Sequence, residues 1–269
     1  MERWLQERIL SGICCHRFGF LLDAGYASEK NQITKTERID FMKTIVIVGA
    51  GKGLCLSLAK RFGKEDFQVA LIARNEEKLQ SMVEELNGLG VKASCYTADI
   101  YQKDQIERAF GFVKATYGVI DVLEFSPTAG NFPPTSVLEL TPENVLDVFN
   151  GMVIGAINCV NLVLPDMQKR GSGTILFTAG LSAMYPIPMM GNIGIAMTGL
   201  SNYAANLSTE LEPKGIHAGL MALGLFMKPG TGAANDPEVI ADAIYKKYAE
   251  NRPGVEAYPE GVTPATILM

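Results

Sequence analysis

The stretch TIVIVGAGKGLC, residues 44–55, joins a run of β-branched residues directly to a glycine-rich turn. A short apolar run of this kind is typical of a strand buried on both faces of a parallel sheet. Gly49, Gly51 and Gly53 permit a tight turn and let backbone N–H groups approach a pyrophosphate at the start of the next helix. The position of the turn directly after a buried strand favours dinucleotide binding. A turn that only packs a helix on a strand is the alternative.

Apolar runs and helical patterns alternate along the rest of the chain. The apolar runs predict strands, and the segments with helical periodicity between them predict helices. Strands are expected over 68–74, 92–99, 121–127, 173–180, 215–224 and 255–259. Helices are expected up to about 62, over 75–90, 101–118 and 141–170, from 191 onward, and over 236–251. This alternation predicts one α/β domain with a doubly wound parallel sheet, the Rossmann fold, over residues 42–269.

The composition argues against several classes of function. The chain has 269 residues, of which 48% are hydrophobic, and a formal net charge of −5. A mildly acidic protein has no electrostatic attraction to nucleic acid or to an anionic membrane. No stretch approaches the roughly 18 uninterrupted apolar residues of a membrane span. Five cysteines without CxxC spacing and two histidines predict neither a disulfide framework nor a metal site, and they indicate a reducing, cytoplasmic setting.

The first 41 residues differ in composition from the rest of the chain. They hold the only tryptophan, Trp4, and a polar tract that ends at Asp40. We interpret residues 1–41 as an N-terminal extension that is disordered or translated from an upstream start, because MKTIVIVGAG from Met42 reads like a natural beginning. An amphipathic docking helix over residues 2–10 is the alternative.

The glycine turn carries a resemblance to a known family. The spacing Gly49-x-x-x-Gly53-x-Cys55 resembles the GxxxGxG turn of the short-chain dehydrogenase/reductase family, and the order of strands and helices is similar from Met42 to Met269. Cys55 replaces the third glycine, where close packing of the helix favours a small residue. The resemblance implies a nicotinamide-dependent oxidoreductase that acts on a small organic carbonyl or enone-type substrate. It also implies a homo-oligomer, a dimer or a tetramer.

The expected cofactor site combines the glycine turn with the ends of the second and third strands. Asp99 matches the family's adenine-contacting aspartate, and a cap for the following helix is its alternative role. The expected cofactor-binding residues are Gly49, Gly51, Lys52, Gly53, Leu54, Arg74, Asp99 and Ile100.

The charges near this site predict which cofactor binds. NAD-selective sites place a carboxylate at the end of the second strand, on the ribose 2′-hydroxyl. Here Ala73 and Arg74 occupy that place, and Lys52 lies inside the glycine turn. Two cations and no carboxylate suit a 2′-phosphate, so NADP(H) is favoured over NAD(H). A solvated surface charge is the alternative reading of each cation.

The positions at which the family carries its chemistry hold other residues here. The resemblance places the proton-donating tyrosine at Ile193, the lysine four residues later at Met197, the serine at Gly180 and the asparagine at Met152. Instead of an acid–base pair, an apolar stripe at helical spacing continues along the helix. The chain is therefore interpreted as an atypical member that lacks the usual Ser-Tyr-Lys residues.

Few side chains remain as candidates for catalysis. Tyr185 and Ser182 lie in the loop after the fifth strand, which lines the substrate cleft in the family, and a packed loop aromatic is the alternative for Tyr185. Glu124 is unusual in a buried parallel strand; a strand-end residue in water is favoured over a perturbed carboxylate facing the cleft. Two functions stay open, a reductase with a rebuilt site and a catalytically silent nucleotide-binding sensor or partner subunit. A pure interaction module ranks third, because it leaves Lys52 and Arg74 without a purpose.

Overall fold

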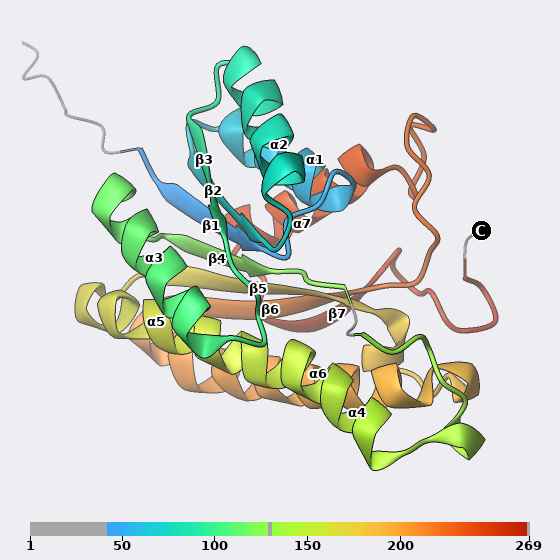
Figure 1. The fold of residues 1–269 in the computed structure, drawn as a ribbon. Coiled ribbons are helices and arrows are strands. Elements are labelled where there is room, and N and C mark those ends of the chain that lie inside the picture. The colour runs from blue at the N-terminus through green and yellow to red at the C-terminus, as the bar shows by residue number, and fades with distance from the viewer. Residues whose placement is uncertain (1–41, 129–130, 268–269) are drawn as a thin grey trace, which may run out of the picture. The chain divides into compact units, whose positions relative to one another are not determined.

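The computed structural model describes residues 42–128 and 131–267, and the extension over residues 1–41 lies outside the described residues. Within these ranges one parallel sheet has the strand order β3-β2-β1-β4-β5-β6-β7 (Figure 1). The strands are β1 Thr44–Val48, β2 Gln68–Ala73, β3 Ala93–Thr97, β4 Val122–Phe125, β5 Gly173–Gly180, β6 Ile216–Leu223 and β7 Gly254–Tyr258. The order reverses between β1 and β4, as in a doubly wound Rossmann fold, which confirms the predicted fold class.

Helices cover both faces of the sheet (Figure 1). They are α1 Leu54–Gly63, α2 Glu76–Gly88, α3 Lys103–Tyr117, α4 Pro142–Phe149, α5 Gly155–Arg170, α6 Gly191–Leu211 and α7 Pro237–Ala249. The first, second and seventh helices share one buried apolar cluster with the sheet, and the third to sixth share the other. Successive residues of β1 enter opposite clusters, because side chains alternate across a strand.

Local sequence signals explain where several helices begin. Asn75 caps α2 by accepting a hydrogen bond from the backbone N–H of Lys78 at 2.8 Å. The predicted cap of Thr141 on α4 is present as a capping box with Asn144. A polar side chain just before each of these helices therefore sets its first turn.

The predicted single helix over 141–170 contains an irregularity. A π-helical turn over Asn150–Ile154 separates α4 from α5, while the helical path continues. A Cβ added to Gly151 would lie 2.6 Å from the Tyr101 hydroxyl oxygen, so the turn packs closely on the segment after β3. The hydrophobic pattern of residues 141–170 predicts a helix but does not distinguish a π-helical turn from an α-helical one.

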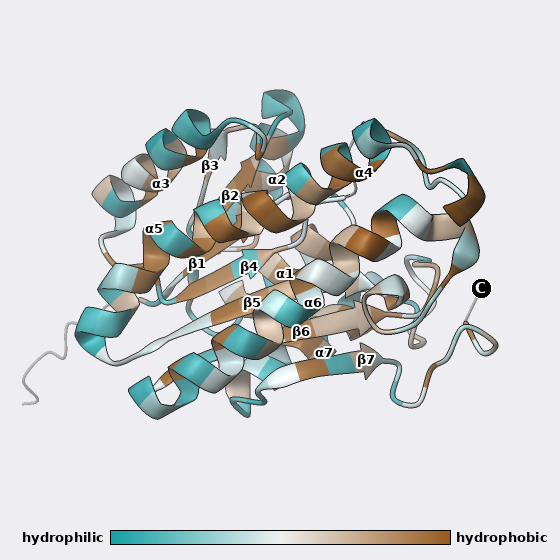
Figure 2. Cartoon of the chain, turned by 90° about the horizontal axis from the view of Figure 1, so that it is seen from below, coloured by the Kyte–Doolittle hydropathy of each residue, from teal (hydrophilic) through white to brown (hydrophobic). Residues whose placement is uncertain are grey.

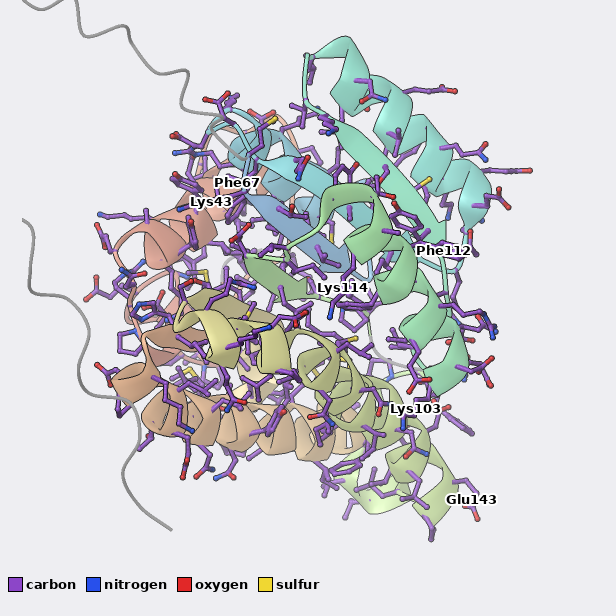
Figure 3. The ribbon with its side chains drawn as sticks, turned by 90° about the vertical axis from the view of Figure 1, so that its left-hand side faces the viewer. Lys43, Phe67, Lys103, Phe112, Lys114 and Glu143 are labelled. Atoms are coloured by element: carbon purple, nitrogen blue, oxygen red, sulfur yellow. The ribbon has the colours of Figure 1, made fainter. Side chains whose placement is uncertain are left out.

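The continuous helix Pro142–Arg170 also meets the length and hydropathy requirements of a membrane span, which the sequence interpretation did not anticipate. Half of its most apolar window is buried inside the domain. Lys114 ties α3 to this helix, since its Nζ donates hydrogen bonds to the Leu162 carbonyl oxygen at 2.8 Å and to Asp166 Oδ2 at 2.6 Å (Figure 3). These contacts are of the kind a core helix makes in a globular domain.

Candidate functional site

The turn after β1 requires glycine at its first position. Gly49 has φ +84°, a conformation that side chains disfavour. A Cβ there would also lie 2.4 Å from the Cα of Pro127. The N–H groups of Gly49 and Ala50 donate to the Ile72 carbonyl oxygen at 2.8 and 3.1 Å, which ties the turn to the end of β2. Gly49 is thus needed both for its backbone angle and for its lack of volume.

The next two glycines leave space in front of a helix N-terminus. A Cβ on Gly51 or Gly53 would meet no other atom within 4 Å. Gly53 is the N-cap of α1, with no side-chain capping bond and no acidic residue in the first turn of the helix. The unsatisfied N–H groups at such a helix start attract an anion, so the turn fits a phosphate group in charge, hydrogen bonding and available volume.

A cleft of about 290 Å³ adjoins this turn at the carboxyl ends of the strands, where the strand order reverses. This is the place where doubly wound sheets bind ligands. Four of the predicted residues line it: Gly49, Gly51, Arg74 and Ile100. Lys52, Gly53, Leu54 and Asp99 are not among its lining residues.

The cleft has further walls that the sequence interpretation missed. These are Asn75 and Lys78 at the start of α2, Tyr101 after β3, and Thr128 after β4. Burial raises the pKa of the Tyr101 hydroxyl, the Asp147 carboxylate raises it further, and the nearby Arg74 guanidinium opposes the rise. Lys78 lies in the first turn of α2, and its N–H donates to the Asn75 cap, so the predicted helix start could have indicated a second cation near Arg74.

The cations differ in what they contact. Within the described ranges neither Arg74 nor Lys78 forms a salt bridge, and both side chains are exposed at the cleft. Lys52 instead donates from Nζ to Ser81 Oγ at 3.0 Å. Asp99 Oδ1 accepts from the Tyr101 N–H at 3.1 Å in the turn after β3, whereas the N-cap residue of α3 is Gln102, which makes no side-chain capping bond.

Larger clefts lie elsewhere. One of about 400 Å³ lies beside the edge strand β3 and is lined by Glu76, Tyr96 and Arg108, among others. Another, about 650 Å³ and wide open, follows α6 from Gly194 to Asn202. Neither includes the glycine turn or a helix N-terminus that lacks a cap. Volume alone therefore does not select a candidate site, and the cleft of about 290 Å³ is the one that adjoins the uncapped helix start behind the glycine turn.

Glu124 is a correction to the sequence interpretation. It is 1% exposed, on the face of β4 that α1 covers, and is not a strand-end residue in water. The Thr178 hydroxyl donates to Glu124 Oε1 at 2.6 Å, while Oε2 has no partner in the described structure. Burial raises the pKa of Glu124 to about 7, and the hydrogen bond from Thr178 lowers it in part.

The thiol of Cys55 is close to both the Glu124 carboxyl group and the glycine turn. Its Sγ donates to the Gly49 carbonyl oxygen at 3.5 Å. Burial raises the pKa of the Cys55 thiol to about 11, and the Glu124 charge adds to the rise. A thiol with this pKa is neutral and unreactive at pH 7, so Cys55 acts as a small packing residue where the helix approaches the turn.

The start of α6 is apolar and closed. Ile193 is 5% exposed and Met197 is 7% exposed, and both belong to the buried cluster beneath the sheet. Asn192 is fully buried: its Oδ1 accepts from the N–H groups of Thr135 and Ile193, each at 2.9 Å, and its Nδ2 donates to the Pro133 carbonyl oxygen at 3.0 Å. The helix start therefore anchors the loop after β4.

The two candidate proton donors lie just before this helix. Ser182 is buried, and its Oγ has no hydrogen-bond partner in the described residues, whereas its carbonyl oxygen accepts from Thr198 Oγ1 at 3.3 Å. Tyr185 is half-buried, and its backbone N–H donates to the Leu181 carbonyl oxygen. No hydrogen bond joins Ser182 to Tyr185 in the part of the chain that the structure describes. The described residues also contain no group of three side chains able to ligate a metal ion.

Comparison with known proteins identifies the family. The family described as short chain dehydrogenase matches residues 43–238. The chain belongs to this family of oxidoreductases. Among short-chain dehydrogenases, "Dehydrogenase/reductase SDR family member 4" of Sus scrofa is 25% identical over 187 residues, which are 68% of this chain and 65% of the relative.

Solved structures of similar fold include two with bound nicotinamide nucleotides. An actinorhodin polyketide ketoreductase variant with NADPH has a TM-score of 0.71 and 24% identity, over 80% of this chain and 94% of that one. A 7α-hydroxysteroid dehydrogenase, in complex with NADH and 7-oxo glycochenodeoxycholic acid, has a TM-score of 0.74 and 20% identity, over 83% and 95%. At these identities the likeness shows the shared Rossmann architecture of the short-chain dehydrogenases.

Proposed function

We propose that this short-chain dehydrogenase binds NADP(H) and catalyses hydride transfer to or from a small organic carbonyl or enone-type substrate, at a site without the usual Ser-Tyr-Lys residues. The observation that carries the proposal is the uncapped start of α1 behind Gly51 and Gly53, beside a cleft that holds two cations. A dinucleotide with a 2′-phosphate matches these features, because its pyrophosphate can lie at the helix start and its 2′-phosphate at the two cations.

The residues present fit the cofactor in the following way. Backbone N–H groups after Gly51 hold the pyrophosphate, and Arg74 and Lys78 hold the 2′-phosphate. Asn75 adds a polar side chain at the same helix start. When bound, the nicotinamide supplies or accepts the hydride. Because a similar structure contains NADH, the proposed preference for NADP(H) rests on the charges of this chain.

The transfer of a hydride to a carbonyl carbon leaves an oxygen that must take up one proton. The family's donor positions hold Ile193 and Met197, so the donor must come from elsewhere. Tyr185 is the proposed donor, and Ser182 Oγ, buried and without a partner, is the proposed group that orients the oxygen. The cost of losing a matched acid is about 3–5 kcal/mol of barrier, which is less than the roughly 7–11 kcal/mol that positioning the reactants can contribute.

The cofactor proposal is tested by fluorescence titration with NADPH and NADH. The wild-type protein is expected to bind NADPH at least tenfold more tightly, and Arg74→Asp to remove most of this preference. Lys246→Asp makes the same charge change on α7, at a side chain that is 68% exposed, and is expected to keep the preference. Equal affinities of the wild-type protein for the two nucleotides contradict the proposal.

A catalytically silent nucleotide-binding sensor or partner subunit is the second candidate, because the burial of Ile193 and Met197 favours it. NADPH oxidation across a panel of aldehydes, ketones and enones separates the two functions. Turnover that falls at least tenfold in Tyr185→Phe supports the reductase and its donor. Tight NADPH binding with no turnover on the whole panel supports the sensor.

We further propose a homo-oligomer that is formed through the helices α4, α5 and α6. Leu146 on α4, Ile154 at the end of the π-helical turn before α5, and Ile195 on α6 are 56%, 40% and 47% exposed, and exposed apolar side chains of this kind can form an interface. Sedimentation velocity tests this: Ile195→Asp is expected to lower the mass to that of one chain.

A further inference from the structure

The loops at the carboxyl edge of the sheet expose a group of apolar side chains, which we call the apolar rim. It consists of Phe132, Val137 and Leu138 after β4, Met184 and Met189 after β5, and Phe226 and Met227 after β6. These seven are half of the fourteen large hydrophobic side chains that are exposed in the described part of the chain. Leu138 is 92% exposed and Met189 69%. Such a concentration on three connections marks a binding surface.

The three loops lie against one another. The Thr135 carbonyl oxygen accepts from the Gly191 N–H at 2.7 Å, and the short turn Val137–Glu139 packs on the turn Pro188–Met190. A Cβ on Gly224, at the start of the third loop, would lie 3.2 Å from Leu181 Cδ2. Figure 2 shows hydrophobic colouring on the loop that precedes α4. The three loops that carry the rim residues therefore adjoin one another.

This region is continuous with the proposed cofactor site. The N–H of Asn131, next to Phe132, donates to Asp147 Oδ2 at 2.7 Å, and this carboxylate lies near the hydroxyl of Tyr101, which lines the cleft. Behind the rim, the start of α6 presents Ile193 and Met197 to the core. A substrate that reaches the nucleotide from this side meets hydrocarbon on its way.

Charged groups are scarce on the same loops. Residues 131–141, 181–190 and 224–235 contain Glu139 and Lys228 as their only charged side chains. A polar or anionic substrate, such as a sugar or a dicarboxylate, has few partners there to replace the water that it loses. An alkyl chain or a fused ring system loses no hydrogen bonds and gains contact with the rim.

We infer that the substrate is a hydrocarbon-rich carbonyl compound, whose alkyl or ring portion binds the apolar rim while its carbonyl group faces the nicotinamide. This inference rests on the proposed function and names its substrate class. Each methylene that moves from water onto the rim is expected to tighten binding by up to about fourfold.

The experiment uses the full chain saturated with NADPH and the apolar fluorescent probe anilinonaphthalene sulfonate. Displacement of the probe measures the dissociation constants of 2-hexanone, 2-octanone and 2-decanone. In the wild-type protein, the affinity for the ketone is expected to rise from 2-hexanone to 2-octanone and again to 2-decanone. The double variant Leu138→Ser with Met189→Ser is expected to flatten this dependence, while Leu89→Ser, at a 61% exposed side chain after α2, retains it. The NADPH dissociation constant is expected to stay within twofold in all three proteins.

Other outcomes overturn the inference. With NADPH bound, equal affinities for the three ketones reject the substrate class and leave the proposed function standing. An unchanged dependence in the double variant rejects the rim as the binding surface. Flotation with phosphatidylcholine vesicles that is lost in the double variant, without ketone length dependence, assigns the rim to a lipid surface instead. Failure to bind NADPH rejects the proposed function itself, and with it this inference.

Discussion

Two helix starts at the carboxyl edge of the same sheet differ in almost every property. The turn from β1 into α1 has no side-chain cap, and its glycines Gly51 and Gly53 face empty space. The entry into α6 is closed: the Gly191 N–H donates to the Thr135 carbonyl oxygen, the Ile193 N–H donates to Asn192 Oδ1, and a Cβ on Gly191 would lie 2.9 Å from the Val137 Cα. Glycine serves ligand approach at the first site and backbone packing at the second. The parallel topology places a helix N-terminus after β1 and another after β5. Local packing around each N-terminus decides whether a ligand can reach its N–H groups.

The comparison predicts that the α6 entry contributes to stability and not to cofactor binding. Met197→Ala removes a buried side chain and is expected to lower the free energy of unfolding by about 2–5 kcal/mol, measured by urea denaturation. NADPH affinity should stay within twofold. Met189→Ala, at a side chain that is 69% exposed, is the control and should change stability by no more than about 0.5 kcal/mol. An unaltered unfolding free energy in Met197→Ala means that this position is open rather than packed.

Glu124 lies between the two regions, beneath α1 and bonded to Thr178 of β5, and it predicts a pH dependence of stability. Its pKa is about 7 in the folded protein and 4.5 ordinarily, so between these values the folded state holds a proton that the unfolded state has released. Stability therefore falls as pH rises from 4.5 to 7, by about 3 kcal/mol at about 1.36 kcal/mol per pH unit.

Replacing the carboxyl group with an amide removes this titration. Glu124→Gln is expected to be about 3 kcal/mol more stable than the wild-type protein at pH 8 and equal to it at pH 4, as measured by urea denaturation at both pH values. Thr178 can still donate to the amide oxygen, so the packing is preserved. Equal unfolding free energies of the two proteins at pH 8 show that the carboxylate is solvated.

A pair of matched substitutions sharpens the comparison at the glycines. Gly51→Val places a side chain in the open space before α1, so NADPH affinity is expected to fall at least tenfold, about 1.4 kcal/mol, with little change in stability. Gly191→Val forces a side chain against the Val137 backbone and is expected to do the opposite, with a loss of about 1–3 kcal/mol of stability. Titration calorimetry and thermal unfolding measure the two effects. If both variants lose affinity equally, the two helix starts share one function.

Much of the fold follows from local pattern, as particular segments show. The alternation of buried strands and amphipathic helices predicted all seven strands that the structure describes, because each strand is short, apolar and bounded by turn residues. The π-helical turn at Asn150–Ile154 was missed, and it packs closely on Tyr101, some 50 residues away in sequence.

The residues of the candidate site also divide into those that local pattern predicted and those that it missed. Gly49, Gly51, Arg74 and Ile100 were predicted from their place after strands and do line the cleft. Tyr101 and Thr128 were missed, since they meet the glycine turn only when β3 and β4 take their places in the sheet. Glu124 was misplaced because a carboxylate ordinarily stays in water, and the covering helix and the Thr178 hydroxyl that bonds it come from distant parts of the chain.

The sequence by itself determined the class of fold, the position of the glycine turn and the absence of a tyrosine–lysine pair at the start of α6, because these depend on residue type and spacing along the chain. Only the tertiary structure decided that Glu124 is buried, that Lys52 contacts Ser81 and not the cleft, and that three distant loops form one apolar rim. Burial and proximity arise from the packing of segments that are far apart in sequence, and a local pattern carries no information about which of them meet.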